Sequence, residues 1–578
     1  MLVSDAVAAV LADFGADTVF GVVGSGNFHV TNALIARGAR FVAARHECGA
    51  ASMADGWARI SGRPGIVSVH QGPGLTNAMT GITEAAKSRT PMLVLAADVA
   101  ASAVRSNFRI DVAGLASAVG AVPARLHSAD FAVDDTVRAY RTAVRDRRTV
   151  VLALPLDVQA AECAAPPVEL MDAAQAAAGS ATGAPRPELT GPARNQARGP
   201  GARARLLRES VGPEAPVRLA EAIRRAERPV FIAGRGARNA GARADLEQLA
   251  DSCGALLATS AAAKGLFRGN PWDLDISGGF ASPLAAELIR GADLVVAWGC
   301  ALNMWTMRHG ALIGPGTVVV QVDIEPGALG AHRQVHFGVT GDVADVARAV
   351  SAAWGDVAVP GYRTAELSRR IEDQVRWRDV PYEDESDGHR IDPRTLTISL
   401  DDILPAERIV AVDSGNFMGY PSMYLSVPDA DGFCFTQAYQ SIGLGLASAI
   451  GSAIARPDRL VVAALGDGGA LMGISELETA VRLGLPMVIV VYDDEAYGAE
   501  VHHFGPDGYP VDTVRFPPVD IAKIARGFGC AAAKVRQVSD LSAVREWLDG
   551  PRDSPLLVDA KVTSERGSWW LEEAFRGH

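Results

Sequence analysis

Cysteine is scarce in this 578-residue sequence, and the few cysteines lie far apart. They are Cys48, Cys163, Cys253, Cys300, Cys434 and Cys530. No CxxC pair is present from which a zinc or dithiol redox site could be built. A chain of this length also needs no disulfide staples to hold its core. We therefore expect reduced thiols and a cytoplasmic protein.

Long apolar runs and an excess of positive charge are also missing. No uncharged apolar run approaches the ~20 residues that cross a bilayer. The N-terminal segment MLVSDAVAAVLADFG carries Asp5 and Asp13 where a secretory signal needs a basic start and an unbroken apolar stretch, so we expect an amphipathic helix. Lysine and arginine number 55 against 67 acidic residues, a net charge of −12. We expect neither a membrane nor a nucleic acid as partner.

Three blocks of alternating strand-like and helix-like segments make up most of the sequence. Short β-branched runs alternate with Ala-rich helical stretches, which is typical of parallel sheets covered by helices. The predicted strands are TVFGVVG, RFVAAR, GIVSVH, PMLVLAADV and TVVLALPLDV in the first block, PVFIAG, ALLATS, ADLVVAWG and TVVVQVDI in the second, and RIVAVD, RLVVAALGD, MVIVVYDD and LLVDAKV in the third. We predict an α/β protein with three doubly wound parallel-sheet domains.

The domain boundaries follow from composition. We place the domains at residues 1–163, 217–355 and 391–578, the last including a C-terminal tail. A stretch rich in Pro, Ala and Gly separates the first two at 164–216, and a polar stretch separates the last two at 356–390.

Two acidic turns follow apolar runs in the third block. GDGG at 466–469 ends the run VVAAL, and Asp493-Asp494 ends MVIVVY. Ligands of open α/β sheets bind at the carboxyl ends of strands, so Asp467 and Asp494 could share Mg²⁺ while glycine amides approach a diphosphate. Taken alone, the motif is more often a tight turn, and paired aspartates are more often a solvated loop.

These turns resemble the thiamine diphosphate signature, GDG followed downstream by NN, of the acetohydroxyacid (acetolactate) synthase, pyruvate decarboxylase and benzoylformate decarboxylase family. VFGVVG at 19–24, RHE at 45–47, ADGWAR at 54–59 and GPGLTN at 72–77 extend the resemblance over nearly the whole chain. It implies pyrimidine-binding, central Rossmann-like and diphosphate-binding domains in this order. It also implies a homodimer or homotetramer with active sites between subunits.

The resemblance assigns the cofactor's pyrimidine end to three residues. Glu47 would hydrogen-bond N1′ and favour the 4′-imino form that removes the C2 proton, although a glutamate outside this context is ordinarily a surface carboxylate. Gln440 would accept the 4′-amino hydrogen bond through its backbone carbonyl. Ile442 would be the bulky residue under which the cofactor bends.

The diphosphate and metal end is implied in the same way. The remaining cofactor-binding candidates are Asn77, Ser414, Gly415, Asn416, Asp467, Gly468, Gly469 and Asp494, and the Mg²⁺ ligands are Asp467, Asp494 and the carbonyl of Ala496. The sequence departs from the family because NN is here Asp493-Asp494. We therefore expect two carboxylates to face Mg²⁺ and to strengthen the dependence on the divalent ion.

Candidates on the substrate side are Glu500, His70, Gln71 and Ser25. Glu500 lies, by register from Asp494, where pyruvate and indolepyruvate decarboxylases have an acid/base glutamate; the alternative is an exposed helix carboxylate. His70 lies where benzoylformate decarboxylase also has histidine. A structural histidine that donates to a backbone carbonyl is the alternative.

The resemblance implies a thiamine diphosphate- and Mg²⁺-dependent enzyme. We predict that it decarboxylates a 2-oxo acid, with pyruvate as first choice, and transfers the acyl carbanion to a carbonyl acceptor as a carboligase. A simple decarboxylase or aldehyde lyase is the alternative, because NFRID at 107–111 lacks the glutamine of the synthases' Phe-Gln-Glu stretch. A flavin- or nicotinamide-binding oxidoreductase and a non-catalytic cofactor-binding homologue are the alternatives from other classes. GRGA at 234–237 lacks the third glycine of a dinucleotide loop, so FAD is not favoured.

Overall fold

A computed structural model describes residues 1–164, 214–355 and 357–571. The predicted linker at 164–216 lies almost entirely outside the described residues. The chain divides into two compact units. The first comprises residues 1–199, 436–456 and 473–483, and the second comprises 200–435, 457–472 and 484–578.

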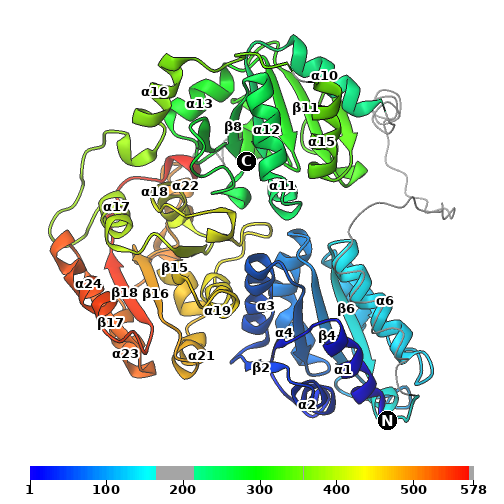
Figure 1. Ribbon diagram of the computed structural model, residues 1–578. Helices are drawn as coiled ribbons and strands as arrows, with labels where there is room; N and C mark the ends of the chain where they lie inside the picture. Colours follow the sequence, from blue (N-terminus) through cyan, green and yellow to red (C-terminus); the bar gives the residue numbers. More distant parts are fainter. Residues whose placement is uncertain (165–213, 356, 572–578) are drawn as a thin grey trace. The chain divides into compact units, whose positions relative to one another are not determined.

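The first unit is built on a parallel six-stranded sheet of order β2-β1-β3-β4-β6-β5 (Figure 1). Its strands are β1 (Thr18–Gly21), β2 (Arg40–Ala43), β3 (Gly65–Val69), β4 (Met92–Asp98), β5 (Val122–Arg125) and β6 (Thr149–Pro155). Its helices are α1 (Val3–Asp13), α2 (Phe28–Ala36), α3 (Glu47–Ser61), α4 (Pro73–Lys87), α5 (Val112–Ala118), α6 (Ala132–Arg145), α7 (Leu156–Gln159), α19 (Gly445–Ala455) and α21 (Glu476–Arg482).

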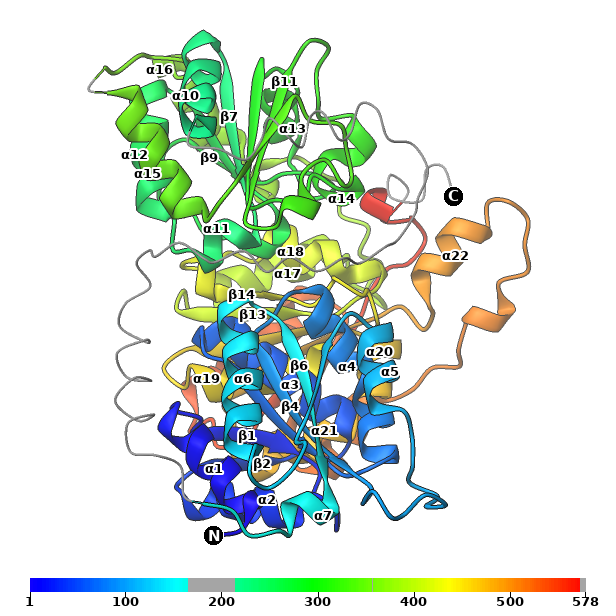
Figure 2. The ribbon, with the colours of Figure 1, turned by 90° about the vertical axis from the view of Figure 1, so that its right-hand side faces the viewer.

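Helices cover both faces of this sheet. Leu93 and Leu95 of β4 belong to one buried cluster with Val7 of α1 and Tyr140 of α6. Helices α3 and α4 pack against each other (Figure 2). The amphipathic helix predicted at the N-terminus is α1.

The second unit contains two further parallel six-stranded sheets. The central sheet has the order β12-β11-β10-β7-β8-β9, with β7 (Pro229–Ala233), β8 (Leu256–Thr259), β9 (Asp273–Ile276), β10 (Leu294–Trp298), β11 (Val318–Asp323) and β12 (Phe337–Thr340). Its helices are α10 (Ala215–Arg225), α11 (Arg235–Asn239), α12 (Arg243–Cys253), α13 (Pro283–Arg290), α14 (Met304–Met307), α15 (Val343–Trp354) and, within the polar stretch, α16 (Ala365–Gln374).

The third sheet has the order β14-β13-β15-β16-β18-β17. Its strands are β13 (Arg408–Val412), β14 (Phe433–Phe435), β15 (Leu460–Gly466), β16 (Met487–Asp493), β17 (Ala531–Val535) and β18 (Leu556–Lys561). The accompanying helices are α17 (Pro393–Ile403), α18 (Gly419–Tyr424), α20 (Asp467–Met472), α22 (Gly498–Phe504), α23 (Ile521–Phe528) and α24 (Ser542–Asp549). Short 3-10 helices η1–η8 occur at 261–263, 308–310, 326–328, 377–379, 416–418, 430–432, 512–514 and 538–541.

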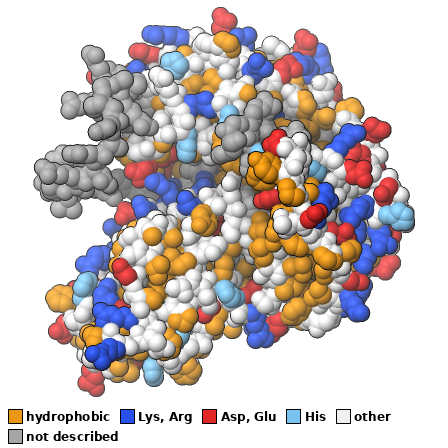
Figure 3. Space-filling model, turned by 180° about the vertical axis from the view of Figure 1, so that it is seen from behind, with side chains coloured by type: hydrophobic (Ala, Val, Ile, Leu, Met, Phe, Trp, Pro, Cys, Tyr) orange, Lys and Arg blue, Asp and Glu red, His pale blue; other side chains and the backbone are white. Residues whose placement is uncertain are grey.

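The predicted fold class, three parallel-sheet α/β domains, is confirmed. Each predicted strand is present, but the sequence patterns missed β5, β9, β12, β14 and β17, all of which lie at a sheet edge. Lysine and arginine side chains are interspersed with aspartate and glutamate on the face shown in Figure 3. Among the described residues, no helix has the length and apolar character needed to cross a membrane.

Candidate active site

The predicted site residues fall into two groups, one in each compact unit. The first unit contains Ser25, Glu47, His70, Gln71, Asn77, Gln440 and Ile442. The second unit contains Ser414, Gly415, Asn416, Asp467, Gly468, Gly469, Asp494, Ala496 and Glu500.

Glu47 is the first residue of α3, and three residues separate it from the end of β2. Its carboxylate is partly buried and accepts a hydrogen bond from Nδ2 of Asn77 at 3.1 Å. His46 caps the N-terminus of the helix, because its Nδ1 accepts the N–H of Cys48 at 3.1 Å. A carboxylate in the first turn of a helix lies near unpaired N–H groups, which favour negative charge. The N-terminal turns of α3 and α4 thus bring Glu47 and Asn77 together, as two members of one site require.

A carboxylate that the sequence analysis missed holds the backbone before Glu47. Glu476 of α21 is buried, and its Oε1 accepts the N–H groups of Arg45 at 3.1 Å and His46 at 3.0 Å. Burial raises the pKa of Glu476, against hydrogen bonds that lower it. Glu476 therefore fixes the path of the RHE segment into α3. Only long-range pairing could have revealed it, since 430 positions separate it from His46.

His70 and Gln71 directly follow β3 and face the loop after β1. Nδ1 of His70 accepts the N–H of Gly26 at 3.0 Å, so in the neutral ring Nε2 carries the proton. A donor role for His70, toward a ligand or toward a backbone carbonyl, would therefore fall to Nε2. Gln71 is buried, and its Oε1 has no hydrogen-bond partner among the described residues. Ser25 is exposed in the same loop as Gly26. A buried acceptor without a donor suits a ligand that brings an N–H or O–H group.

Gln440 and Ile442, which are predicted to contact the cofactor's pyrimidine end, directly precede α19. Gln440 has a backbone φ of +62°, which a side-chain-bearing residue rarely adopts, and its side chain is exposed. Ile442 is partly buried, and Gly443 has a φ of +91°. The segment is thus a tight, irregular turn and not the start of a regular helix.

The predicted diphosphate and metal residues lie at the carboxyl ends of three adjacent strands. In the third sheet β13, β15 and β16 are neighbours, and they lead into Ser414–Asn416, Asp467–Gly469 and Asp494 respectively. Gly415 has a φ of +138°, which requires glycine. The strand order therefore brings the three loops to one edge of the sheet.

The electrostatics of this edge fit a divalent cation. Burial, then Asp494, then Asp493 raise the pKa of Asp467 to about 8. Burial also raises the pKa of Asp494 to about 6, although the N–H of Ala496 and the amide of Asn416 lower it. Buried carboxylates that repel each other in this way become favourable when a hard cation binds between them. No group of three His, Cys, Asp or Glu side chains suited to a metal is found in the described part of the chain. The predicted ligand set has two carboxylates and a carbonyl.

Asp493, the residue before the predicted Mg²⁺ ligand Asp494, is paired with a lysine. Its Oδ2 forms a buried ion pair with Nζ of Lys561, and its Oδ1 accepts the N–H of Glu495 at 3.2 Å. Lys561 also lies 3.3 Å from Asp559 and donates to the carbonyl of Val519 at 3.0 Å. Burial alone would lower the pKa of Lys561, but the hydrogen bond and charge of Asp493 raise it. Lys561, on β18, is the counter-charge that allows an aspartate where the family has asparagine.

We expect Lys561→Met to lower the free energy of unfolding of the apo chain by about 3 kcal/mol, because it leaves Asp493 and Asp559 buried without their cation. The loss should be smaller in an Asp493→Asn background, where only Asp559 loses a partner. Denaturant unfolding of the four proteins forms a double-mutant cycle. An equal loss in both backgrounds would show that the two residues do not stabilise each other.

The far C-terminal segment is attached to the same edge of the sheet. Oγ of Ser568 lies 3.0 Å from the carbonyl oxygen and 2.7 Å from Oδ1 of Asn416. Trp570 is buried and packs edge-to-face on Tyr420, with ring centroids 4.8 Å apart. Glu500 lies exposed on α22, the helix that follows Asp494. Ser568 was not among the predicted site residues, and its tie to Asn416 spans 152 positions.

Three models of one family match the chain. They are described as thiamine pyrophosphate enzyme, N-terminal TPP binding domain (residues 1–115), central domain (217–350) and C-terminal TPP binding domain (413–560). The N-terminal match contains Glu47, and the C-terminal match contains Asp467 and Asp494.

Curated proteins are similar over most of their length. A probable 2-ketoarginine decarboxylase of Pseudomonas aeruginosa is 29% identical, with 94% of this chain and 90% of that protein covered. A sulfoacetaldehyde acetyltransferase of Alcaligenes xylosoxydans is 27% identical, with 84% and 80% covered. The acetolactate synthase isozyme 2 large subunit of Escherichia coli is 25% identical, with 96% and 95% covered.

A solved structure has the same fold. It is a thiamine diphosphate-dependent 4-hydroxybenzoylformate decarboxylase of Rhodococcus jostii RHA1, with a TM-score of 0.77 and 22% sequence identity. The alignment covers 98% of this chain and 100% of that one.

Proposed function

Since this chain belongs to the thiamine pyrophosphate enzyme family, we propose that it uses thiamine diphosphate and Mg²⁺ to decarboxylate a 2-oxo acid and passes the acyl unit to a carbonyl acceptor. The observation that carries the proposal is the placement of Asp467 and Asp494 at the carboxyl ends of the adjacent strands β15 and β16, within the match to the C-terminal TPP binding domain. When bound, the cofactor supplies a nucleophilic carbon and an electron sink for the decarboxylation.

Two groups of residues would bind the two ends of the cofactor. Asp467, Asp494 and the carbonyl of Ala496 would hold Mg²⁺, and the loops at 414–416 and 468–469 would offer N–H groups to the diphosphate. Oxygen ligands are those that Mg²⁺ prefers, so this donor set suits it. The irregular backbone at 414–416 begins with a buried serine, which suits close approach to a phosphate.

At the other end, Glu47 would exchange a proton with the pyrimidine N1′, with Asn77 holding the carboxyl group in place. The carbonyl of Gln440 would accept a hydrogen bond from the amino group, and Ile442 would support the ring. His70 and Gln71 would orient the substrate. Nε2 of His70 would donate a hydrogen bond to it, and Oε1 of Gln71, which has no partner among the described residues, would accept one from it. Ser25, in the facing loop, would contribute its hydroxyl.

A simple decarboxylase is the second candidate, and Glu500 favours it. An exposed carboxyl on α22 could return a proton at product release, which ends the reaction without an acceptor. Carboligation consumes the second carbonyl compound, whereas simple decarboxylation leaves it unchanged.

The glycines of GRGA give no support to the flavin alternative. A Cβ atom on Gly234 or Gly236 would overlap the backbone of Gly299, which itself has a φ of +58°. Close packing between the loops after β7 and β10 therefore accounts for both glycines. An oxidoreductase would show flavin absorbance or hydride transfer in the purified chain.

Product analysis tests the proposal directly. The chain is incubated with thiamine diphosphate, Mg²⁺ and a panel of 2-oxo acids that includes pyruvate and 2-ketoarginine, with and without an aldehyde acceptor such as sulfoacetaldehyde. We expect CO₂ release and, with the right acceptor, a coupled product detected by mass. Release of free aldehyde at an unchanged rate with every acceptor would identify a decarboxylase. Cofactor binding without CO₂ from any acid would support the non-catalytic alternative.

A further inference from the structure

The segment predicted to carry the cofactor's pyrimidine ring is held in an unfavourable conformation. It runs from Thr436, after β14, to Leu444, before α19, and the positive φ of Gln440 lies in its middle. Such a backbone persists only where its surroundings fix it from both sides. The contacts on either side of Gln440 therefore determine where its carbonyl and the side chain of Ile442 lie.

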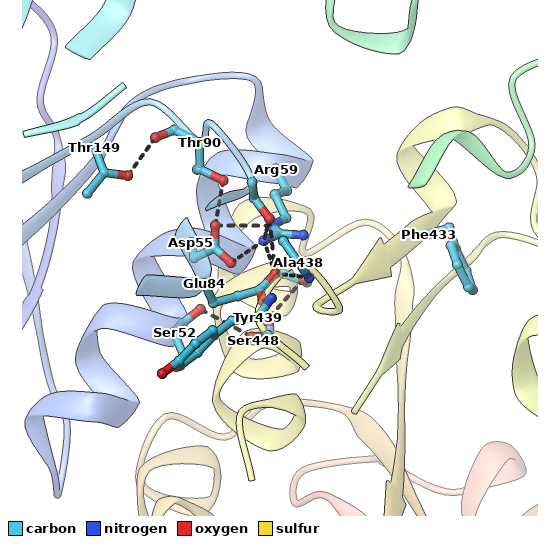
Figure 4. A network of polar contacts seen from close by, with 12 residues as sticks. Ser52, Asp55, Arg59, Glu84, Thr90, Thr149, Phe433, Ala438, Tyr439 and Ser448 are labelled. Atoms are coloured by element: carbon cyan, nitrogen blue, oxygen red, sulfur yellow. Dashed lines mark hydrogen bonds and ion pairs between the residues drawn. The ribbon is translucent and has the colours of Figure 1, made fainter. Parts of the chain in front are cut away.

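On the N-terminal side, one buried carboxylate fixes two successive peptide groups. Glu84 of α4 is 1% exposed, and it accepts the N–H of Ala438 at 3.2 Å through Oε1 and the N–H of Tyr439 at 2.7 Å through Oε2 (Figure 4). The ammonium group of Lys87, one turn further along α4, lies 5.7 Å from the ring centroid of Tyr439. The chain is thus anchored immediately before Gln440.

Glu84 is itself held rigidly. Arg59 of α3 donates to its Oε1 at 2.8 Å, and the hydroxyl of Ser88 donates to the same oxygen at 2.9 Å. Nε of Arg59 also donates to Asp55 at 3.0 Å, and Asp55 accepts the hydroxyl of Thr90 at 2.6 Å. Burial would raise the pKa of Glu84, but Arg59 and the two amides lower it, so the carboxylate is ionised at neutral pH. Figure 4 shows Asp55, Arg59, Glu84 and Thr90 as one connected network.

On the C-terminal side, α19 packs on α3 with almost no space between their backbones. A Cβ atom on Gly56 would overlap the carbonyl of Ser448, and one on Gly451 would overlap the carbonyl of Met53. The hydroxyl of Ser448 donates to the carbonyl of Ser52 at 3.4 Å. The segment is therefore anchored at both ends. Glu84 of α4 holds its N-terminal end, and the packing of α19 on α3 holds its C-terminal end.

We propose that Glu84 and Arg59 are positioning residues of the cofactor site, which hold the turn at Ala438–Ile442 so that the carbonyl of Gln440 and the side chain of Ile442 meet the pyrimidine ring. This role rests on the proposed function. Neither residue touches the cofactor. Glu84 acts through the two amides it binds, and Arg59 acts through Glu84.

The decisive variant is Glu84→Gln in the full-length chain, because glutamine keeps the size but loses the charge shared by Arg59 and the two amides. We expect the affinity for thiamine diphosphate, measured by calorimetry with saturating Mg²⁺, to fall by about tenfold to a hundredfold, the range for loss of a charged hydrogen bond. Amide exchange of the apo chain over residues 436–442 should become faster.

Asp135→Asn is the matched control. Asp135 is 3% exposed on α6, accepts the N–H of His127 at 2.9 Å and pairs with Arg138, so it is an equally buried carboxylate of the same unit. We expect it to leave cofactor affinity and exchange at 436–442 unchanged. Glu84→Asp keeps the charge beside Arg59 but shortens the reach to the two amides. It should weaken cofactor binding in the same direction, and it preserves the test should the glutamine variant not fold.

The outcomes separate this proposal from the proposed function. A wild-type chain that does not bind thiamine diphosphate refutes the function and, with it, the positioning role. A wild-type chain that binds the cofactor while both Glu84 variants bind it equally well refutes the positioning role alone. Equal losses in Glu84→Gln and Asp135→Asn would also refute it, because a merely structural carboxylate would behave in that way.

Discussion

Glu47→Gln is expected to lower turnover by a factor on the order of 100 to 10,000 without disturbing the fold, which is the range for removal of a general acid or base. Glutamine fills the same volume at the start of α3 and can still pair with the amide of Asn77, but it cannot exchange a proton with the pyrimidine N1′. Steady-state rates and deuterium exchange at C2 of the bound cofactor, followed by NMR, measure the effect.

The control for Glu47→Gln is Glu478→Gln. Glu478 lies on α21 and forms an ion pair with Arg45, two positions before Glu47, at 2.6 Å. Its removal disturbs the neighbourhood of Glu47 but takes no proton carrier away, so turnover should change little. Unchanged turnover in Glu47→Gln itself would contradict the role of the carboxyl group.

Asp467→Asn is expected to abolish the retention of thiamine diphosphate that depends on Mg²⁺. The proposed site has two carboxylates. Loss of one weakens Mg²⁺ binding, so the negative charge of the diphosphate is less well neutralised. Gel filtration in Mg²⁺ followed by quantification of bound cofactor measures retention. Asp429→Asn, which removes an aspartate paired with Arg459 in the same unit, is the control and should retain cofactor normally. Normal retention in Asp467→Asn would contradict the site.

The Asp467→Asn variant should have a higher free energy of unfolding than the wild type when no cofactor is bound. The pKa of Asp467 is raised to about 8 in the folded chain, above its value in the unfolded chain, so folding favours the protonated form. The stability that this provides is lost as the pH rises through about 8. The apo Asp467→Asn chain should therefore unfold at a higher temperature than the apo wild type at pH 8 and above, and the difference should shrink toward pH 5. Calorimetry of both apo chains tests this.

Sequence reasoning found every interior strand, but of the edge strands it found only β2. The interior strands β4, β10 and β16 have buried residues throughout and read as continuous apolar runs. The missed strands lie at sheet edges, and β5 (VPAR) and β17 (AAAKV) are half-exposed, so their sequences resemble loops. An edge strand has one neighbour, and its residues face less of the core. Whether such a segment pairs as a strand therefore depends on the tertiary structure more than on the hydrophobic pattern of its own sequence.

In the candidate site too, local features could be predicted from the sequence and long-range contacts could not. The motifs near Glu47 and Asp467 could be found because the chain concentrates them in a few consecutive positions. The partners of Asp493 and of the turn before Gln440 could not, since Lys561 lies 68 positions away and Glu84 lies 355 positions from Tyr439. A buried charge pair leaves no periodic signal in the sequence.

Helix α3 carries Glu47 at its first residue and Arg59 in its last turn, about 18 Å apart at 1.5 Å per residue. If each catalytic centre takes Glu47 from one chain and the Gln440 turn from the other, the two ends of this helix serve different centres. Co-expressed Glu47→Gln and Glu84→Gln chains should then complement each other at low thiamine diphosphate. Every mixed pair would carry one fully wild-type centre and one doubly impaired one. Centres assembled within single chains would show no such rescue.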